Sequence, residues 1–271
     1  MSLRFEVTDG VAVITLDRPE VRNAFSGEMG RALDDAYRRA DRDDGIRAVV
    51  LTGTPPAFCS GADLSGGGDT FGAPTGERFS AAATAVPAWE VRKPVIAAVN
   101  GHAIGLGLTL ALQCDLRIVA ADATYGIVQV RRGVMGDAYS HWTLPRLVGT
   151  AVAADLLLTG RTFDGHEAVA LGIANRVLPA DEVLPAALTL AHDLAVHTAP
   201  LSVAASKRLL WDSWRLTPEE VEAAETAAHR VLMGHPDARE GVTAFLERRP
   251  PRWTGRPGTL DEGTRPGSNG P

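Results

Sequence analysis

Two short glycine-containing segments could each present a backbone N–H group to a ligand. They are Ser60-Gly61-Ala62-Asp63 and Gly105-Leu106-Gly107, and each stands between an expected strand and an expected helix. Together, two such N–H groups can form an oxyanion hole, which stabilises negative charge on a thioester oxygen without a side chain. Taken alone, the glycines of either turn are better explained by a helix that packs closely on a strand.

The second segment belongs to a stretch from 94 to 120 whose pattern predicts strand, tight turn, buried helix and strand. An apolar run covers Val95–Val99, glycines follow Asn100, the residues up to Ala111 are apolar on every side, and a β-branched run covers 116–120. The first turn of such a helix has unpaired backbone N–H groups and the positive end of the helix dipole. Its start could therefore hold an anion or a developing oxyanion.

The preceding chain alternates strands and helices. Apolar runs predict strands at Val11–Leu16 and Ile46–Thr52, and between them Ser26 is a suitable N-cap for an amphipathic helix. Residues 65–76 resemble a mobile loop, and an apolar stripe predicts a helix from about Glu77 to Arg92.

Later segments are mainly helical. Helices are expected around 151–158 and 163–171, with a brief strand at 173–177. From Pro179 onward nearly every segment has a helical pattern, and Thr217 followed by proline and two glutamates marks a helix start. The last residues, 254–271, are rich in glycine and proline and predict a loosely ordered tail.

Composition limits the classes of partner. The 271 residues are 45% hydrophobic and 22% charged with a net charge of −6, and their arginines are scattered, so we expect no nucleic-acid partner. No apolar run approaches membrane-spanning length, and the N-terminus lacks a signal-peptide core, so we expect a cytoplasmic protein without a membrane partner. Cys59 and Cys114 form no metal-ligand spacing with the histidines, so no metal site is expected.

The chain resembles the crotonase superfamily, which includes the enoyl-CoA hydratases and isomerases. The similarity extends from about residue 11 to 253, and it rests on VAVITLDRPEVRNA, AVVLT followed by FCSGADL, KPVIAAVNGHAIGLGLTLALQCDLRIVA, TYGIVQVRRGV, LPRLVG with LLLTGRTFDGHEAVALGIANRV, and GVTAFLERRPPRW. The resemblance implies an α/β fold, a spiral of repeated strand-strand-helix turns in residues 1–200. A helical region, residues 201–253, would then pack on the core and on neighbouring subunits to build a homotrimer or hexamer, followed by a flexible tail, residues 254–271.

The resemblance also implies an acyl-CoA thioester as the ligand, with coenzyme A as part of the substrate and no separate cofactor. The implied oxyanion donors are the N–H groups of Ala62 and Leu106, although the family usually has glycine where this chain has Leu106. The residues implied to bind the CoA moiety are Arg22, Ala24, Ser60, Asp63 and Leu64, together with Phe245 and Arg248 near the nucleotide, the last two from a neighbouring subunit.

The catalytic positions depart from those of a hydratase. Such enzymes add water with a pair of glutamates, and the matching positions here hold Thr109 and Gln129, neither of which exchanges a proton near neutral pH. Asp137 remains, and by resemblance it matches a carboxylate that shuttles protons in several isomerases and is the nucleophile in the aroyl-CoA dehalogenase branch. The alternative is that Asp137 only caps the helix that begins near Tyr139.

Several neighbouring residues are weaker candidates. Tyr139, His141 and Trp142 could line the acyl pocket, and His141 could be a second acid or base, although histidines in such positions, His141 and His102 alike, are more often packed or hydrogen-bonded residues. Asp63 and Asp115 are interpreted as structural, through hydrogen bonds to turns.

The sequence therefore leaves three hypotheses. The first is an enzyme that isomerises a double bond, or hydrates it atypically, through an enolate with Asp137 as the single acid and base. The second is thioester hydrolysis or dehalogenation with Asp137 as the nucleophile. The third is a non-catalytic acyl-CoA binder. The acyl group and the pathway are not defined by the sequence.

Overall fold

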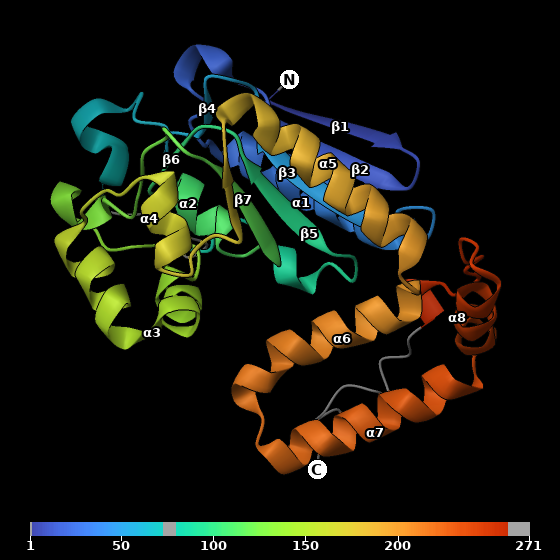
Figure 1. The fold of residues 1–271 in the computed structure, drawn as a ribbon. Helices are drawn as coiled ribbons and strands as arrows, with labels where there is room; N and C mark the ends of the chain where they lie inside the picture. Colours follow the sequence, from blue (N-terminus) through green and yellow to red (C-terminus); the bar gives the residue numbers. More distant parts are fainter. Residues whose placement is uncertain (1, 73–79, 260–271) are drawn as a thin grey trace.

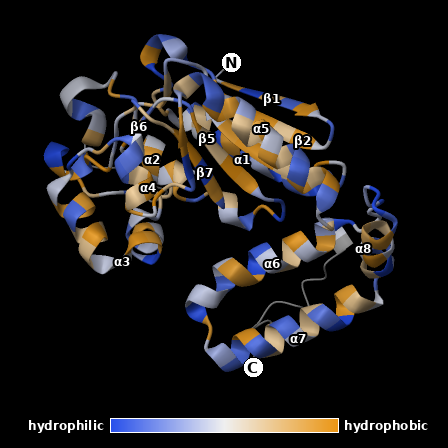
Figure 2. Ribbon diagram, viewed as in Figure 1, coloured by the Kyte–Doolittle hydropathy of each residue, from blue (hydrophilic) through white to orange (hydrophobic). Residues whose placement is uncertain are grey.

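The computed structural model describes residues 2–72 and 80–259. Its larger sheet has the strand order β1-β2-β3-β5-β7-β9, antiparallel between β1 and β2 and parallel elsewhere (Figure 1). The strands are β1 Leu3–Thr8, β2 Val11–Leu16, β3 Ala48–Gly53, β5 Val95–Val99, β7 Leu116–Ala120 and β9 Arg176–Leu178. Every residue of β3 and β5 is buried, which explains their continuous apolar runs (Figure 2).

A second sheet repeats the order of the first. It has the order β4-β6-β8, all parallel, with the bounds Ala57–Cys59, His102–Ile104 and Tyr125–Gly126. Each of these strands follows directly on a strand of the larger sheet, β4 after β3, β6 after β5 and β8 after β7. Successive turns of the chain thus add one strand to each sheet, which confirms the predicted spiral of strand-strand-helix turns.

Five helices surround the two sheets. They are α1 Gly27–Arg42, α2 Leu106–Ala111, α3 Ser140–Thr159, α4 Gly165–Ala170 and α5 Ala180–His197. The Ser26 hydroxyl accepts a hydrogen bond from Met29 N at 3.2 Å, which confirms the predicted N-cap. The predicted helix at 151–158 is the second half of α3, which is kinked where Gly149 leaves helical geometry. α5 lies across the larger sheet (Figure 1).

The C-terminal helices extend away from the sheets as an arm (Figure 1). They are α6 Pro200–Asp212, α7 Pro218–Gly234 and α8 Pro236–Glu247. Thr217 and Glu220 form the capping box expected at the start of α7. No described residue of α7 is buried, and α6, α7 and α8 enclose a largely apolar groove of about 890 Å³ that none of the candidate site residues lines.

A buried ion pair fastens this arm to the sheets. Lys207 Nζ on α6 lies 2.7 Å from Asp115 Oδ2 and donates to the carbonyls of Ala88 and Lys93, and Trp211 Nε1 donates to Asp115 Oδ1 at 2.8 Å. Asp115 also accepts from Val95 N at 2.7 Å. The structural role expected for Asp115 is therefore confirmed.

The helix predicted from Glu77 to Arg92 is wrong over its described part. Residues 77–79 lie outside the described residues, and 80–92 form bends with one 3₁₀ turn at Ala88–Glu90. Pro87 has no N–H and disfavours helical geometry at the residue before it, and Val86 N donates to Asp34 Oδ1 instead of a helical carbonyl. Ala83 has a φ of 66°, which also breaks a helix.

Hydrogen bonds hold the first residues of the expected tail. Asp237 accepts from Thr254 N at 2.8 Å and from Gly255 N at 2.9 Å, and Arg92 Nη1 donates to Pro257 O at 3.2 Å. The rest of that segment, 260–271, lies outside the described residues, as does the end of the expected mobile loop at 73–76.

Candidate active site

Both expected oxyanion donors have unpaired N–H groups in the part of the chain that the structure describes. Phe25 pairs with the backbone on either side of Ala62, through Phe25 N to Gly61 O at 2.7 Å and Asp63 N to Phe25 O at 3.0 Å, so the Ala62 N–H is left free. Leu106 is the first residue of α2, and the internal bonds of that helix begin with the Leu108 N–H.

Strand pairing brings the two donor segments together. β4 and β6 are parallel neighbours, with Cys59 opposite Ala103. The position that a Cβ on Gly61 would take is 4.0 Å from Leu106 N, and a Cβ on Gly107 would lie only 2.2 Å from Cys59 O. Close packing of α2 on β4 therefore requires Gly107, and the same packing places the Leu106 N–H beside the Gly61-Ala62 peptide.

Gly105 shapes the start of α2. Its φ of 55° and ψ of −119° are accessible in practice only to glycine, and its N–H donates to Gly126 O at 2.7 Å. The Gln129 amide lies against it, since a Cβ on Gly105 would be 3.4 Å from Gln129 Nε2. The turn that carries one donor is thus in contact with Gln129, which begins the 3₁₀ helix Gln129–Arg132.

Asp137 lies next to this turn and is bound by the two residues that replace the hydratase glutamates. Its Oδ1 accepts a hydrogen bond from Thr109 Oγ1 at 3.0 Å and another from Gln129 Nε2 at 3.1 Å. No other described side chain donates to the carboxyl group, which also interacts with the backbone N–H of Asp137 itself. The sequence placed these three residues in one neighbourhood but did not show that they contact one another.

The surroundings of Asp137 favour its neutral form. Burial raises the pKa of the carboxyl above its ordinary value, while the hydrogen bonds from Thr109 and Gln129 and the nearby His141 act in the opposite direction. The alternative role as a helix cap is wrong, because Tyr139 is the N-cap of α3 and no side chain caps that helix. A carboxyl with a raised pKa is suited to proton transfer.

Aromatic side chains form a cluster that includes Tyr139, two residues after Asp137. Trp89 is in contact with Tyr139 at 4.9 Å and with Trp142 at 5.0 Å between ring centroids, and Trp211 and Trp214 of the arm complete it. Trp142 therefore packs within this cluster, whereas Tyr139 is 41% exposed.

The two histidines differ in their contacts. His141 is exposed on the first turn of α3, and its Nδ1 is 3.5 Å from Ser140 Oγ. His102 Nδ1 accepts from Thr124 N at 2.9 Å, so His102 is a hydrogen-bonded residue that joins two segments of the smaller sheet.

The residues expected to line the CoA groove are brought together around the first donor. Ser60 N donates to Arg22 O at 3.0 Å, and Arg22 has a φ of 54°. Ala24 is buried and Leu64 is 49% exposed. Backbone hydrogen bonds hold residues 22–25 beside residues 60–63.

Arg18 joins these two segments, and the sequence did not identify it. Arg18 Nη1 donates to Ala24 O at 2.7 Å and to Asp63 Oδ2 at 2.8 Å, and this hydrogen bond keeps the pKa of Asp63 below its ordinary value. Asp63 Oδ1 also accepts from Ser65 N at 3.0 Å, so its structural role is confirmed. The sequence indicated Arg18 only as an arginine in the turn that follows the strand Val11–Leu16.

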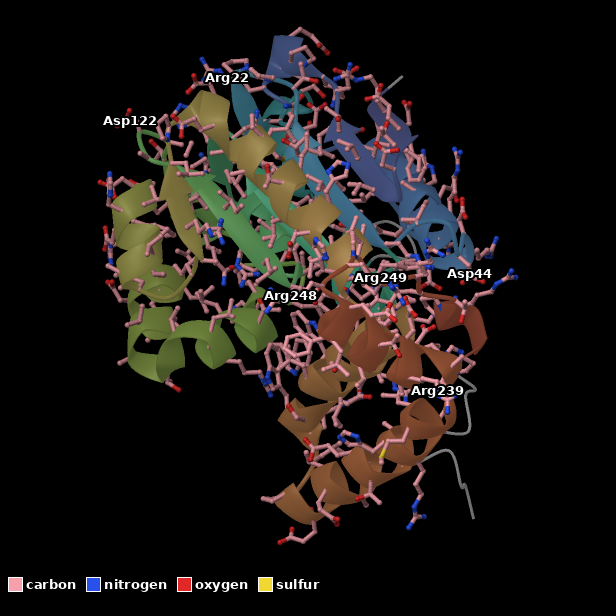
Figure 3. All side chains as sticks on the ribbon, turned by 45° about the vertical axis from the view of Figure 1, so that its right-hand side comes forward. Arg22, Asp44, Asp122, Arg239, Arg248 and Arg249 are labelled. Carbon is pink, nitrogen blue, oxygen red and sulfur yellow. The ribbon has the colours of Figure 1, made fainter. Side chains whose placement is uncertain are left out.

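Two expected CoA contacts are not near this site within one chain. Phe245 is on α8 and is 82% exposed, and Arg248 is the C-cap of the same helix. Arg22 and Arg248 lie in separate parts of the molecule (Figure 3). In residues 2–72 and 80–259 no group of three or more metal-binding side chains occurs, and none of the described helices meets the length and hydropathy needed to cross a membrane.

Comparisons with known proteins agree with this geometry. A sequence model of the family Enoyl-CoA hydratase/isomerase matches residues 6–256. The enoyl-CoA hydratase ACTT3 of Alternaria alternata is 36% identical over 247 residues, which are 90% of this chain and 83% of that protein.

Solved structures show the same similarity. A probable enoyl-CoA hydratase/isomerase from Mycobacterium abscessus matches with a TM-score of 0.91 and 57% identity over 94% of this chain and 99% of the other. An enoyl-CoA hydratase from Mycobacterium tuberculosis matches with a TM-score of 0.83 and 34% identity over 94% and 99%. The chain therefore belongs to the enoyl-CoA hydratase/isomerase family within the crotonase superfamily, whose enzymes act on acyl-CoA thioesters.

Proposed function

We propose that the protein isomerises the double bond of an enoyl-CoA thioester through an enolate, with Asp137 as the single acid and base. One observation carries the proposal: Asp137 Oδ1 accepts hydrogen bonds from both Thr109 and Gln129, and no other described side chain donates to the carboxyl group. Thr109 Oγ1 is also 3.2 Å from Leu106 O, so a single side chain separates the carboxylate from the residue that supplies an oxyanion donor.

The reaction needs one base and one stabilised anion. Asp137 Oδ2 removes a proton from C2 of a 3-enoyl thioester, and the electron pair of that C–H bond delocalises into a dienolate. Its negative charge develops on the thioester oxygen, where the N–H groups of Ala62 and Leu106 donate hydrogen bonds. The protonated Asp137 then returns the proton to C4, which gives the 2-enoyl thioester and restores the carboxylate.

Hydration by two carboxylates is not supported by this site. Thr109 is fully buried and Gln129 is nearly so, and both donate hydrogen bonds to Asp137, with the Thr109 hydroxyl shared between Asp137 Oδ1 and Leu106 O. Neither can remove a proton from water near neutral pH. An atypical hydratase would need Asp137 alone to activate the water and supply the proton.

The test is to incubate the purified protein with 3-enoyl-CoA and 2-enoyl-CoA of several chain lengths and to quantify the products. We expect 3-enoyl-CoA to be converted to 2-enoyl-CoA, and we expect Asp137→Asn to lower kcat by about 10²-fold or more. The matched control is Asp122→Asn, because Asp122 is an exposed carboxylate at the edge of the molecule (Figure 3). Full turnover by Asp137→Asn, or an acyl-aspartyl adduct detected by mass spectrometry, would refute the proton-shuttle role.

We also propose that the arm formed by α6, α7 and α8 joins copies of this chain into a trimer. Large apolar side chains on the arm are exposed in the single chain: Leu210, Val231, Met233, Val242, Phe245 and Leu246. Exposed apolar surface of this kind is typical of a subunit interface. Light scattering coupled to size-exclusion chromatography measures the mass directly, and a monomer at micromolar concentration would contradict the proposal.

A further inference from the structure

The hydrogen bonds on Asp137 are unequally distributed between its two oxygens. Thr109 and Gln129 approach from different elements, α2 and the 3₁₀ helix at 129–132, yet both donate to Oδ1. Both donors are buried, Thr109 at 0% and Gln129 at 7% exposure. Buried donors that converge on one oxygen fix the orientation of the carboxyl plane.

The orientation of the Gln129 amide supports this assignment. With Nε2 directed at Asp137, the amide oxygen Oε1 is buried and has no hydrogen-bond partner among the described residues. Buried acceptors without partners are rare in folded proteins. The opposite orientation would place Oε1 against Oδ1, where two acceptors repel each other when Asp137 is ionised. The amide therefore faces Asp137 as a donor, and its own oxygen is left unpaired.

We propose, resting on the isomerase function above, that Thr109 and Gln129 are positioning residues that reserve Oδ1 of Asp137 for hydrogen bonding and so direct the migrating proton to Oδ2. An oxygen that already accepts two hydrogen bonds is the less favourable site for a proton. The proton taken from C2 is then on Oδ2 and can be returned to C4 from the same oxygen without rotation of the carboxyl. A glutamate at either position would provide no donor when ionised.

The charged and titratable neighbours of Asp137 are few. His141 on α3 and the Cys59 thiol at the end of β4 interact with its charge. Neither Thr109 nor Gln129 titrates, and Gln129 Nε2 can only donate, whereas the single hydroxyl hydrogen of Thr109 is shared between Asp137 Oδ1 and Leu106 O. The variants below keep both His141 and Cys59. A change in the pH profile when a donor is removed can therefore be attributed to the loss of a hydrogen bond to Asp137.

The test compares Thr109→Val and Gln129→Met with the wild type. The first is nearly isosteric but lacks the hydroxyl, and the second has a similar length but no amide. We expect kcat/KM for 3-enoyl-CoA to fall by about tenfold on the acidic limb of the pH profile and by less on the plateau, because losing a donor makes the carboxylate harder to form. Thr109→Ser keeps a hydroxyl and should have the same acidic limb in its pH profile as the wild type. Thr52→Val removes a buried hydroxyl bonded to Ala98 O at 3.0 Å and should leave the acidic limb at the wild-type pH.

A second measurement separates this inference from the proposed function. The carboxyl band of Asp137, assigned by its loss in Asp137→Asn, is titrated by infrared spectroscopy in the free protein without substrate. We expect the midpoint to move to higher pH in Thr109→Val and in Gln129→Met. Unchanged midpoints in folded variants, or an equal loss of rate at every pH, would overturn the positioning role. Wild-type turnover by Asp137→Asn would overturn the isomerase mechanism instead, whatever the infrared titration shows.

Discussion

Replacement of Gly107 by alanine tests whether the packing of α2 on β4 places the second oxyanion donor. A Cβ at this position would lie 2.2 Å from Cys59 O and 2.9 Å from both the carbonyl carbon and the Cβ of Cys59. Ordinary contacts of carbon atoms are about 3.5 Å or longer, so α2 must move by roughly 1 Å. Two of these three atoms are backbone, and no side-chain rotation can relieve the contact.

A displacement of this size separates the Leu106 N–H from the Ala62 N–H. Misplacement of a reacting group by about 1 Å can cost about 10²-fold in rate, and loss of one oxyanion donor costs about 10² to 10³-fold in kcat. We therefore expect Gly107→Ala to lower kcat for 3-enoyl-CoA by about 10²-fold, with a smaller change in KM.

The assay is steady-state isomerisation of 3-enoyl-CoA, with circular dichroism and urea unfolding to show that the variant is folded. Gly234→Ala is the matched control, because a Cβ on Gly234 meets no atom within 4 Å. A folded Gly107→Ala variant with wild-type kcat would refute the account of how this turn positions the donor.

Three further predictions concern stability and reactivity. Lys207→Met leaves the Asp115 carboxylate buried without its partner and should lower the free energy of unfolding by about 3 to 5 kcal/mol in urea titrations; a change below 1 kcal/mol would contradict the importance of this pair. Burial raises the pKa of Cys59 and Cys114 to about 12, so neither thiol should react with a disulfide reagent near neutral pH until the protein unfolds. Folding raises the pKa of Asp137. The free energy of unfolding therefore falls as the pH rises from the pKa of Asp137 in the unfolded chain, about 3.9, through its pKa in the folded protein. Asp137→Asn should therefore be more resistant to urea than the wild type at neutral pH, and the difference should narrow in acid.

Local patterns were sufficient to predict the parallel strands and several helix starts. The apolar run Val95–Val99 predicted β5 because a strand buried on both faces has no polar positions, and Ser26 and Thr217 cap helices through contacts within three residues. The helix expected before Arg92 does not form because Pro87 has no N–H to donate and disfavours helical geometry at Val86, which outweighs the apolar stripe.

The sequence could not show how the candidate site is held together. Asp137 and Thr109 are far apart in the chain, and their hydrogen bond depends on the way β6, α2 and the loop before α3 are folded on one another. Arg18 likewise gains its partner Asp63 only through the packing of two separate turns. Residue types indicated the chemistry at single positions, whereas the distribution of hydrogen bonds between Oδ1 and Oδ2 needed the three-dimensional structure.

The most direct test of the central claim is exchange of the C2 protons of 3-enoyl-CoA with deuterium from D₂O, followed by proton NMR. This measurement detects formation of the enolate itself and does not depend on which product is released. We predict that the wild type catalyses C2 exchange and that Asp137→Asn loses it by about 10²-fold or more, while Asp122→Asn exchanges at the wild-type rate. Exchange by Asp137→Asn at the wild-type rate, or no exchange by the wild type, would contradict an enolate mechanism that depends on Asp137.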